Sequence, residues 1–174
     1  LADYTRSLEL RPDDPDTLNN RGNTYASKGS FDKALPDFDR SLVVRPDHPD
    51  TVYNRALCCC SIGKYREALA GYNRFLKLQP DAAWGLTGHG VARIHLRQWA
   101  LAEADFRLAA QAEPLSADCH LNHAAALLRI DRTPEAEAAL ELAVKCDPEC
   151  HDAWQALEQL RQPPGTDWWR WWFS

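Results

Sequence analysis

Apolar runs that end at a proline recur along the chain at a constant spacing of 34 residues. The runs read "SLELRP", "SLVVRP", "FLKLQP", "LAAQAEP" and "LAVKCDP". Their prolines are Pro12, Pro46, Pro80, Pro114 and Pro148. A proline favours the end of a helix, because it lacks an amide donor and its ring clashes with the preceding turn. The spacing therefore predicts repeats of 34 residues, each of which closes with a helix.

Small and large apolar residues return at the same places when each frame is numbered so that its proline is residue 32. The eighth place holds Gly22, Ala56, Gly90 and Ala124. The twentieth place holds Ala34, Ala68, Ala102 and Ala136, and the twenty-fourth holds Phe38, Tyr72, Phe106 and Leu140. Small residues let two helices approach closely, and the large side chains fill the space beside them. The pattern predicts a packed pair of helices in every frame.

These frames divide the chain into four complete units with partial units at both ends. The complete units are 15–48, 49–82, 83–116 and 117–150. Residues 1–14 match the second helix of a further unit, and residues 151–162 begin like another first helix before they stop at "QPPG". The last segment, 163–174, is a tryptophan-rich tail.

The small residue, the aromatic, the "A-x-x-x-F/Y" spacing and the closing proline at a strict 34-residue period resemble the tetratricopeptide repeat family. The resemblance covers residues 1–162. It implies an all-α fold, an α-solenoid in which antiparallel helix pairs form a right-handed superhelix. It also implies a protein-interaction scaffold in which residues 151–162 form a capping helix over the last repeat.

A repeat array of this kind has a concave groove lined by the first helix of each unit. The sixth place, on this lining, holds Asn20, Asn54, Gly88 and Asn122. Asparagine disfavours helix interiors, so its recurrence needs a reason other than helix propensity. Each amide offers a donor and an acceptor, which an extended peptide backbone complements. The column predicts a peptide-binding ladder; the alternative is that the amides bond neighbouring repeats or face water.

The same column resembles the asparagine ladder in the repeat arm of O-GlcNAc transferases, with Gly88 as the missing rung. Flanking groove positions add Asn19, Asn23, Tyr53 and Arg129 as peptide-binding candidates. Tyr53 has a ring for stacking, and Arg129 has a guanidinium for a carboxylate. Chaperone-binding members of the family hold a terminal carboxylate with basic residues, but the corresponding places here are Asn19, Trp84 and Gly88. We therefore predict that this mode is absent.

A second column, at the second place, holds Asp16, Asp50, Asp118 and Asp152. Acidic residues in the first turn of a helix complement the helix macrodipole. The alternative reading is an acidic edge of the groove that prefers basic peptides.

Composition narrows the classes of partner. The 174 residues carry a net charge of −5, which argues against nucleic acid as the main partner. No apolar run approaches the length of about 18 residues that a membrane span requires. The sequence begins with Leu1, so we take it as a piece of a longer chain. Its six cysteines favour reduced thiols in a cytoplasmic compartment.

Catalytic and metal-binding chemistry is not predicted. The motifs "CHLNH" and "CDPECH" lack the paired spacing of zinc sites, and the "CCC" run has no histidine–acid pair to activate a thiol. We expect no enzyme activity, no metal and no cofactor.

The tail "TDWWRWWFS" gathers five large aromatic residues that need a cover. They are Trp168, Trp169, Trp171, Trp172 and Phe173. Three covers remain open: the chain's own last repeat, a neighbouring chain or domain, which would allow a homodimer, and a membrane interface, the least favoured. We therefore predict a module that binds an extended peptide. The alternatives are a substrate-recruiting arm of a larger enzyme, such as a glycosyltransferase, and a scaffold that self-associates through the tail.

Overall fold

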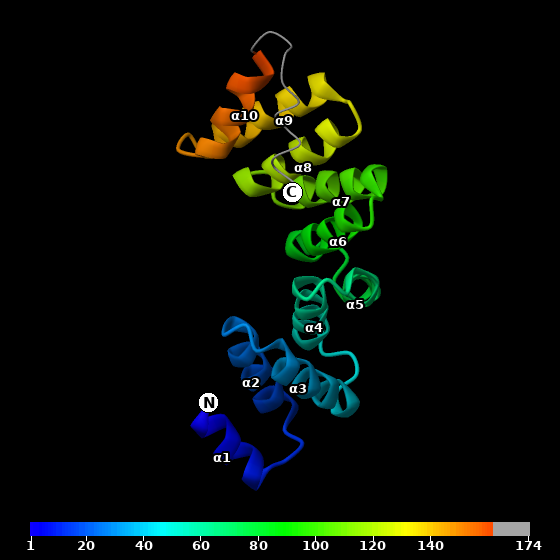
Figure 1. The fold of residues 1–174 in the computed structure, drawn as a ribbon, viewed down its shortest axis with the longest axis vertical. Coiled ribbons are helices and arrows are strands. Elements are labelled where there is room, and N and C mark those ends of the chain that lie inside the picture. The colour runs from blue at the N-terminus through cyan, green and yellow to red at the C-terminus, as the bar shows by residue number, and fades with distance from the viewer. Residues whose placement is uncertain (162–174) are drawn as a thin grey trace. The chain divides into compact units, whose positions relative to one another are not determined.

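The computed structural model describes residues 1–161, which form ten α-helices and no strand (Figure 1). The helices are α1 (Ala2–Leu10), α2 (Pro15–Ser27), α3 (Phe31–Val44), α4 (Pro49–Ser61), α5 (Tyr65–Leu78), α6 (Ala83–His95), α7 (Trp99–Ala112), α8 (Ala117–Arg129), α9 (Thr133–Cys146) and α10 (His151–Arg161). The all-α repeat fold is therefore confirmed. The five aromatic residues of the predicted tail contact lie outside the described residues.

The helices fall into two compact units. The first, residues 1–80, contains α1 to α5, and the second begins at Asp81 and contains α6 to α10. Within each unit every helix packs against the next one in sequence. In addition, α2 contacts α4 in the first unit and α6 contacts α8 in the second. Within each unit, the first helices of the two complete repeats therefore lie side by side, as a groove requires.

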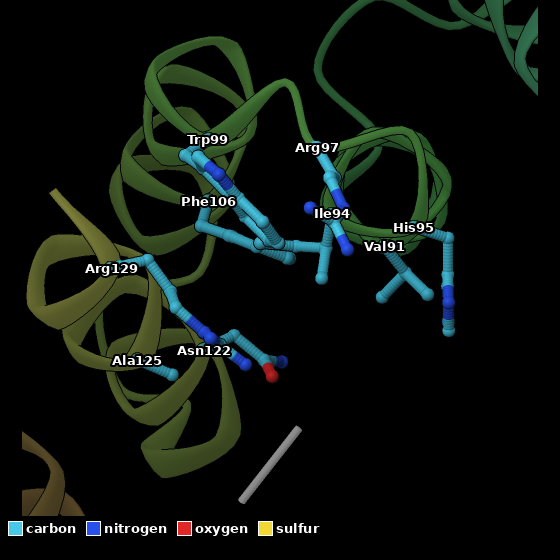
Figure 2. Close-up of a pocket in the computed structure, with 9 residues that line it drawn as sticks. All are labelled: Val91, Ile94, His95, Arg97, Trp99, Phe106, Asn122, Ala125 and Arg129. Atoms are coloured by element: carbon cyan, nitrogen blue, oxygen red, sulfur yellow. The ribbon is translucent and has the colours of Figure 1, made fainter. Parts of the chain in front are cut away.

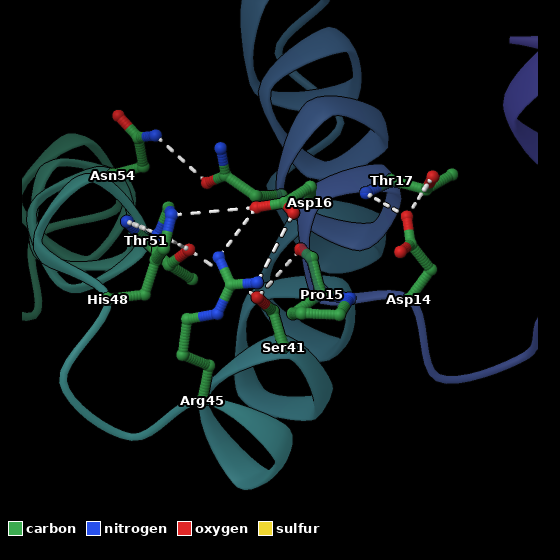
Figure 3. Close-up of polar contacts among 10 residues, drawn as sticks. Asp14, Pro15, Asp16, Thr17, Ser41, Arg45, His48, Thr51 and Asn54 are labelled. Atoms are coloured by element: carbon green, nitrogen blue, oxygen red, sulfur yellow. Dashed lines mark hydrogen bonds and ion pairs between the residues drawn. The ribbon is translucent and has the colours of Figure 1, made fainter.

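Local sequence signals set where the helices begin. The carboxylate of Asp14 caps α2 by accepting a hydrogen bond from the Thr17 amide at 2.9 Å, and Pro15 occupies the first turn (Figure 3). The hydroxyl of Ser116 caps α8 in the same way, through the Cys119 amide at 3.3 Å. These caps satisfy backbone donors that have no partner inside the helix.

The turn inside each helix pair contains one residue with positive φ. Gly29 and Gly63 fill this place in the first unit, with φ of 71° and 78°. In the second unit the same place holds Arg97 and Asp131, with φ of 58° and 59°. Glycine adopts this left-handed conformation without a Cβ clash, whereas other residues adopt it at a cost.

The predicted contact between small and aromatic columns is confirmed. A Cβ atom added to Gly22 would lie 2.7 Å from Cε1 of Phe38, and one added to Gly90 would lie 2.8 Å from Cε1 of Phe106. The ring therefore occupies the space that a side chain would need. Phe38 and Tyr72 are fully buried, so this column forms the centre of the helix pairs.

Charged pairs also lie between the helices. Arg21 on α2 donates two hydrogen bonds of 2.7 Å to Asp37 on α3. In the second unit Nη1 of Arg93 lies 2.8 Å from both carboxylate oxygens of Asp105, and Nδ1 of His89 lies 3.0 Å from the same carboxylate. Ion pairs therefore link the two helices of a pair in both units.

The last described helix covers the apolar end of the second unit. Ala153, Ala156 and Leu157 of α10 are buried in one cluster with Leu140 and Ala143 of α9. This packing removes apolar surface that the final repeat would otherwise expose. No helix within residues 1–161 has the length and apolar character needed to cross a membrane.

The histidine on α8 predicts a pH dependence of stability. Burial lowers the pKa of His123 below its usual value of 6.5, although its Nε2 lies 3.0 Å from Oε1 of Glu103. As the pH falls through about 6.5, the unfolded chain binds a proton that the folded chain resists. This contribution to stability is therefore present above about pH 6.5 and lost in more acidic solution.

We expect the melting temperature of the wild type to fall more between about pH 7.5 and about pH 5.5 than that of His123→Gln. Thermal melts followed by circular dichroism measure the difference, and glutamine retains a donor for Glu103. Equal pH dependence of the two proteins would contradict the assignment.

Candidate functional site

The asparagines of the first unit form a contact between adjacent first helices. Nδ2 of Asn54 on α4 donates a hydrogen bond of 3.1 Å to Oδ1 of Asn19 on α2 (Figure 3). Asn19 is only 7% exposed, so its carbonyl oxygen needs this partner. For Asn54 the structure therefore shows the bond between neighbouring repeats that was the alternative to a ligand contact. The bond also fixes the amide of Asn54 in one orientation.

The other predicted groove residues of this unit differ in their exposure. Asn20 and Asn23 have exposed side chains. Tyr53 packs inward, with its ring centroid 5.5 Å from that of Phe75 and 5.6 Å from that of Tyr72. Burial raises the pKa of the Tyr53 hydroxyl, so this group stays protonated at neutral pH. The ring of Tyr53 is thus part of the α4–α5 packing.

The acidic column is engaged at one position by an arginine. Nη1 and Nη2 of Arg45 donate hydrogen bonds of 2.8 and 3.3 Å to the carboxylate of Asp16 (Figure 3). Nε2 of His48 lies 3.6 Å from the same carboxylate. This pairing reduces the negative charge that Asp16 offers to a ligand.

The second unit contains a cavity of about 490 Å³ between α6, α7 and α8. Figure 2 shows Asn122 and Arg129 extending from α8 toward the space that faces α6. The nine described residues that line the cavity are Val91, Ile94, His95, Arg97, Trp99, Phe106, Asn122, Ala125 and Arg129. Two predicted groove residues, Asn122 and Arg129, are thus brought together.

The ring of Trp99 packs against the guanidinium of Arg129. The guanidinium carbon of Arg129 lies 5.1 Å from the centroid of the Trp99 ring, a cation–π distance. Trp99 is the first residue of α7, and Phe106 lies two turns further along the same helix. The aromatic side chains of α7 that pack within the repeat therefore also line the cavity.

Sequence reasoning missed Arg97 as a groove residue. Arg97 lies beyond the end of α6, in the turn before α7, so no helical column contains it. One signal was available, because an arginine stands where the first two repeats have glycine.

The cysteines are buried or half-buried thiols. All six are free, as predicted, and burial raises the pKa of Cys58 to about 11. A thiol with this pKa is almost entirely protonated at neutral pH and is a poor nucleophile. Within residues 1–161, no group of three His, Cys, Asp or Glu side chains is arranged to hold a metal ion.

Comparison with known families decides the classification. Three models described as tetratricopeptide repeat match residues 3–35, 23–84 and 87–149. The chain belongs to the tetratricopeptide repeat family. This membership confirms the resemblance predicted from the 34-residue period and makes the chain a member of a family of protein-interaction repeats.

Solved structures of tetratricopeptide repeat proteins share the fold. A structure of MamA 41-end from Desulfovibrio magneticus RS-1 has a TM-score of 0.77 at 20% identity, over 84% of this chain and 82% of that one. YrrB, described as a TPR protein with an unusual peptide-binding site, has a TM-score of 0.76 at 18% identity, over 91% and 85%. The first TPR of Spaghetti (RPAP3), bound to the HSP90 peptide SRMEEVD, has a TM-score of 0.61 at 21% identity, over 64% and 89%. A search of curated protein sequences found no match.

Proposed function

We propose that this chain binds an extended peptide segment of a partner protein on the groove side of its first helices. The observation that carries the proposal is the cavity of the second unit, which joins an apolar wall to the amide of Asn122. An apolar pocket with a few polar groups is the usual form of a binding site. An asparagine amide offers a peptide backbone both a donor and an acceptor.

Observations in the first unit support the proposal separately. Asn54 is held by Asn19, and among the described residues its own side-chain oxygen accepts no hydrogen bond. Asn20, which follows Asn19 on α2, is exposed to solvent. A fixed acceptor loses less conformational entropy on binding than a mobile one. Two structures with the same fold, YrrB and the RPAP3 repeat, are described as binding peptides.

The test is the affinity of Asn122→Ala for a peptide selected against the wild type. If two hydrogen bonds of about 1 kcal/mol each are lost, affinity falls roughly 30-fold. The matched control is Asn73→Ala, because Asn73 is an exposed asparagine on α5, a second helix. Fluorescence polarisation with the labelled peptide measures both variants. Equal affinity for the wild type and Asn122→Ala would contradict a ligand contact by this amide.

A further inference from the structure

We propose that residues 163–174 fold back on their own chain and cover one side of α10, the last described helix. We call this side the end face. It bounds a cavity of about 1140 Å³ and includes Pro148, Glu149, Trp154, Leu157, Glu158 and Arg161. Residues 163–174 lie outside the described residues, so the contact is inferred from the end face and from the sequence of the segment. None of these end-face residues lines the cavity of Asn122, so the contact is independent of the proposed peptide binding.

The helix α10 begins a repeat that has no second helix within residues 1–161 (Figure 1). In the four complete repeats, the first helix packs against the second helix that follows it. In contrast, α10 packs against α9, which precedes it. The side of α10 that a following helix would cover therefore has no helical partner among the described residues.

The eighth place of the repeat shows that the end face is this side. An added Cβ on Gly22 would lie 2.7 Å from the ring of Phe38, which is on the second helix of the same repeat. Glu158 occupies the eighth place on α10 and lines the cavity. A glutamate there leaves no room for a ring packed as closely as that of Phe38. The group that covers the end face therefore differs from the second helix of a complete repeat.

The exposure of Trp154 indicates that the end face is covered. Trp154 is 50% exposed and stands at the fourth place of its frame. The complete repeats fill this place with residues that are at most 8% exposed, namely Leu18, Val52, Leu86 and His120. Nε1 of Trp154 donates a hydrogen bond of 3.0 Å to the carbonyl oxygen of Pro148, which fixes the ring. A large ring exposed at a place that is otherwise buried is typical of a contact surface.

The segment 163–174 contains side chains that suit this surface. Its five large aromatic residues are Trp168, Trp169, Trp171, Trp172 and Phe173. Each ring that covers Trp154 removes apolar area from water, and paired rings gain further free energy in offset or edge-to-face arrangements. Long aromatic side chains also reach the surface without the close backbone approach that Glu158 prevents.

Charge supports the same contact. Among the described residues, the carboxylates of Glu149 and Glu158 on the end face form no ion pair. The guanidinium of Arg161, in contrast, donates hydrogen bonds of 2.9 and 2.7 Å to Glu137 and Glu141 on α9. The end face therefore offers carboxylates to a cation. Arg170 supplies one, between the two pairs of tryptophans.

The segment is long enough to reach the end face. Trp154 and Arg161 are seven residues apart on α10, which corresponds to about 10 Å along the helix. Trp168 follows Arg161 by seven residues, and an extended chain of this length spans up to about 25 Å. The intervening "QPPG" favours a turn. A short tether also gives an effective concentration in the millimolar range, which favours this segment over a separate molecule.

A double-mutant cycle in the full chain tests the contact. The tail variant carries Trp168→Ser, Trp169→Ser, Trp171→Ser and Trp172→Ser, and the second variant carries Trp154→Ala. Hydrogen exchange of the α10 amides is measured in the wild type, in both variants and in their combination. We expect the tail variant to exchange about tenfold faster than the wild type, because α10 loses its cover. With Trp154→Ala already present, the tail substitutions should add less than about twofold, because residues in contact are not additive.

The matched control is Leu115→Ala. Leu115 is 86% exposed, lies between α7 and α8, and does not line the cavity of the end face. In this background the tail substitutions should keep their full tenfold effect. An equal effect of the tail substitutions in the Trp154→Ala and Leu115→Ala backgrounds would overturn the contact. So would unchanged exchange of α10 in the tail variant.

Two further measurements identify the occupant. Sedimentation velocity should give a monomer whose α10 exchange is the same at low and high protein concentration. Protection that rises together with a dimer would overturn the intramolecular contact and assign the cover to the segment of a second copy. Vesicles of phosphatidylcholine and phosphatidylserine should not bind the chain. Vesicle binding that the tail substitutions abolish, with α10 exchange unchanged, would overturn the contact in favour of a membrane surface.

Discussion

Replacing Phe38 by alanine is expected to lower the free energy of unfolding by about 3–5 kcal/mol. The ring of Phe38 is fully buried and fills the space above Gly22, where Cε1 lies 2.7 Å from the site of an added Cβ. Alanine would leave a cavity between α2 and α3, and the helices would lose both the transfer free energy of the ring and its contacts.

The matched control for this change lies on the same helix. Val43 of α3 is 81% exposed, so Val43→Ala removes apolar atoms without opening a cavity. We expect its effect to stay within about 0.5 kcal/mol. Because repeat arrays can unfold in parts, hydrogen exchange of the amides in α2 and α3 should be followed together with urea denaturation. Similar effects of the two substitutions would contradict the central role of the ring.

Replacing Asp37 by alanine is expected to cost about 3 kcal/mol, the lower end of the range for breaking a buried ion pair. The side chain of Asp37 is 8% exposed and that of Arg21 is 19% exposed, and their nearest N–O distance is 2.7 Å. Hydrogen bonding to Asp37 also raises the pKa of Arg21. Without the carboxylate, the guanidinium would remain charged between two helices with no compensating acceptor.

A second ion pair in the same unit has the same N–O distance but is more exposed, so comparing the two pairs isolates the effect of burial. Arg40 and Asp13 also approach to 2.7 Å, but their side chains are 49% and 65% exposed. Asp13→Ala is therefore expected to cost at most about 1 kcal/mol. Urea denaturation of both variants measures the contrast, and the double variant Arg21→Leu with Asp37→Leu should recover much of the lost stability. Equal costs at Asp37 and Asp13 would show that burial does not set the strength of the pair.

The fold was accessible from the sequence because its signals are local and repeated. The prolines at 34-residue intervals and the column of Phe38, Tyr72 and Phe106 each report a contact that occurs again in the next repeat. Agreement over four units makes such a signal far stronger than any single helix propensity. Gly22 and Gly90 show the physical reason, because both lie directly against the ring of their own pair.

The candidate site was accessible only in part. Asn122 of the sixth place and Arg129, a second predicted groove residue, both line the cavity of the second unit. The column pattern did not predict that Asn54 bonds Asn19, since these residues occupy different places in their repeats. Partners of this kind depend on the axial offset between adjacent helices, which side-chain packing sets.

The sequence by itself therefore determined the helix pairs, the buried ring column and the family of this chain, because a short-range contact repeated every 34 residues leaves a periodic record. Only the tertiary structure decided which polar groups meet across neighbouring helices. It placed the amide of Asn54 on Asn19, the guanidinium of Arg129 over Trp99, and Arg97 at the edge of the cavity. These contacts depend on the distances and axial offsets between neighbouring helices, which the 34-residue pattern does not record.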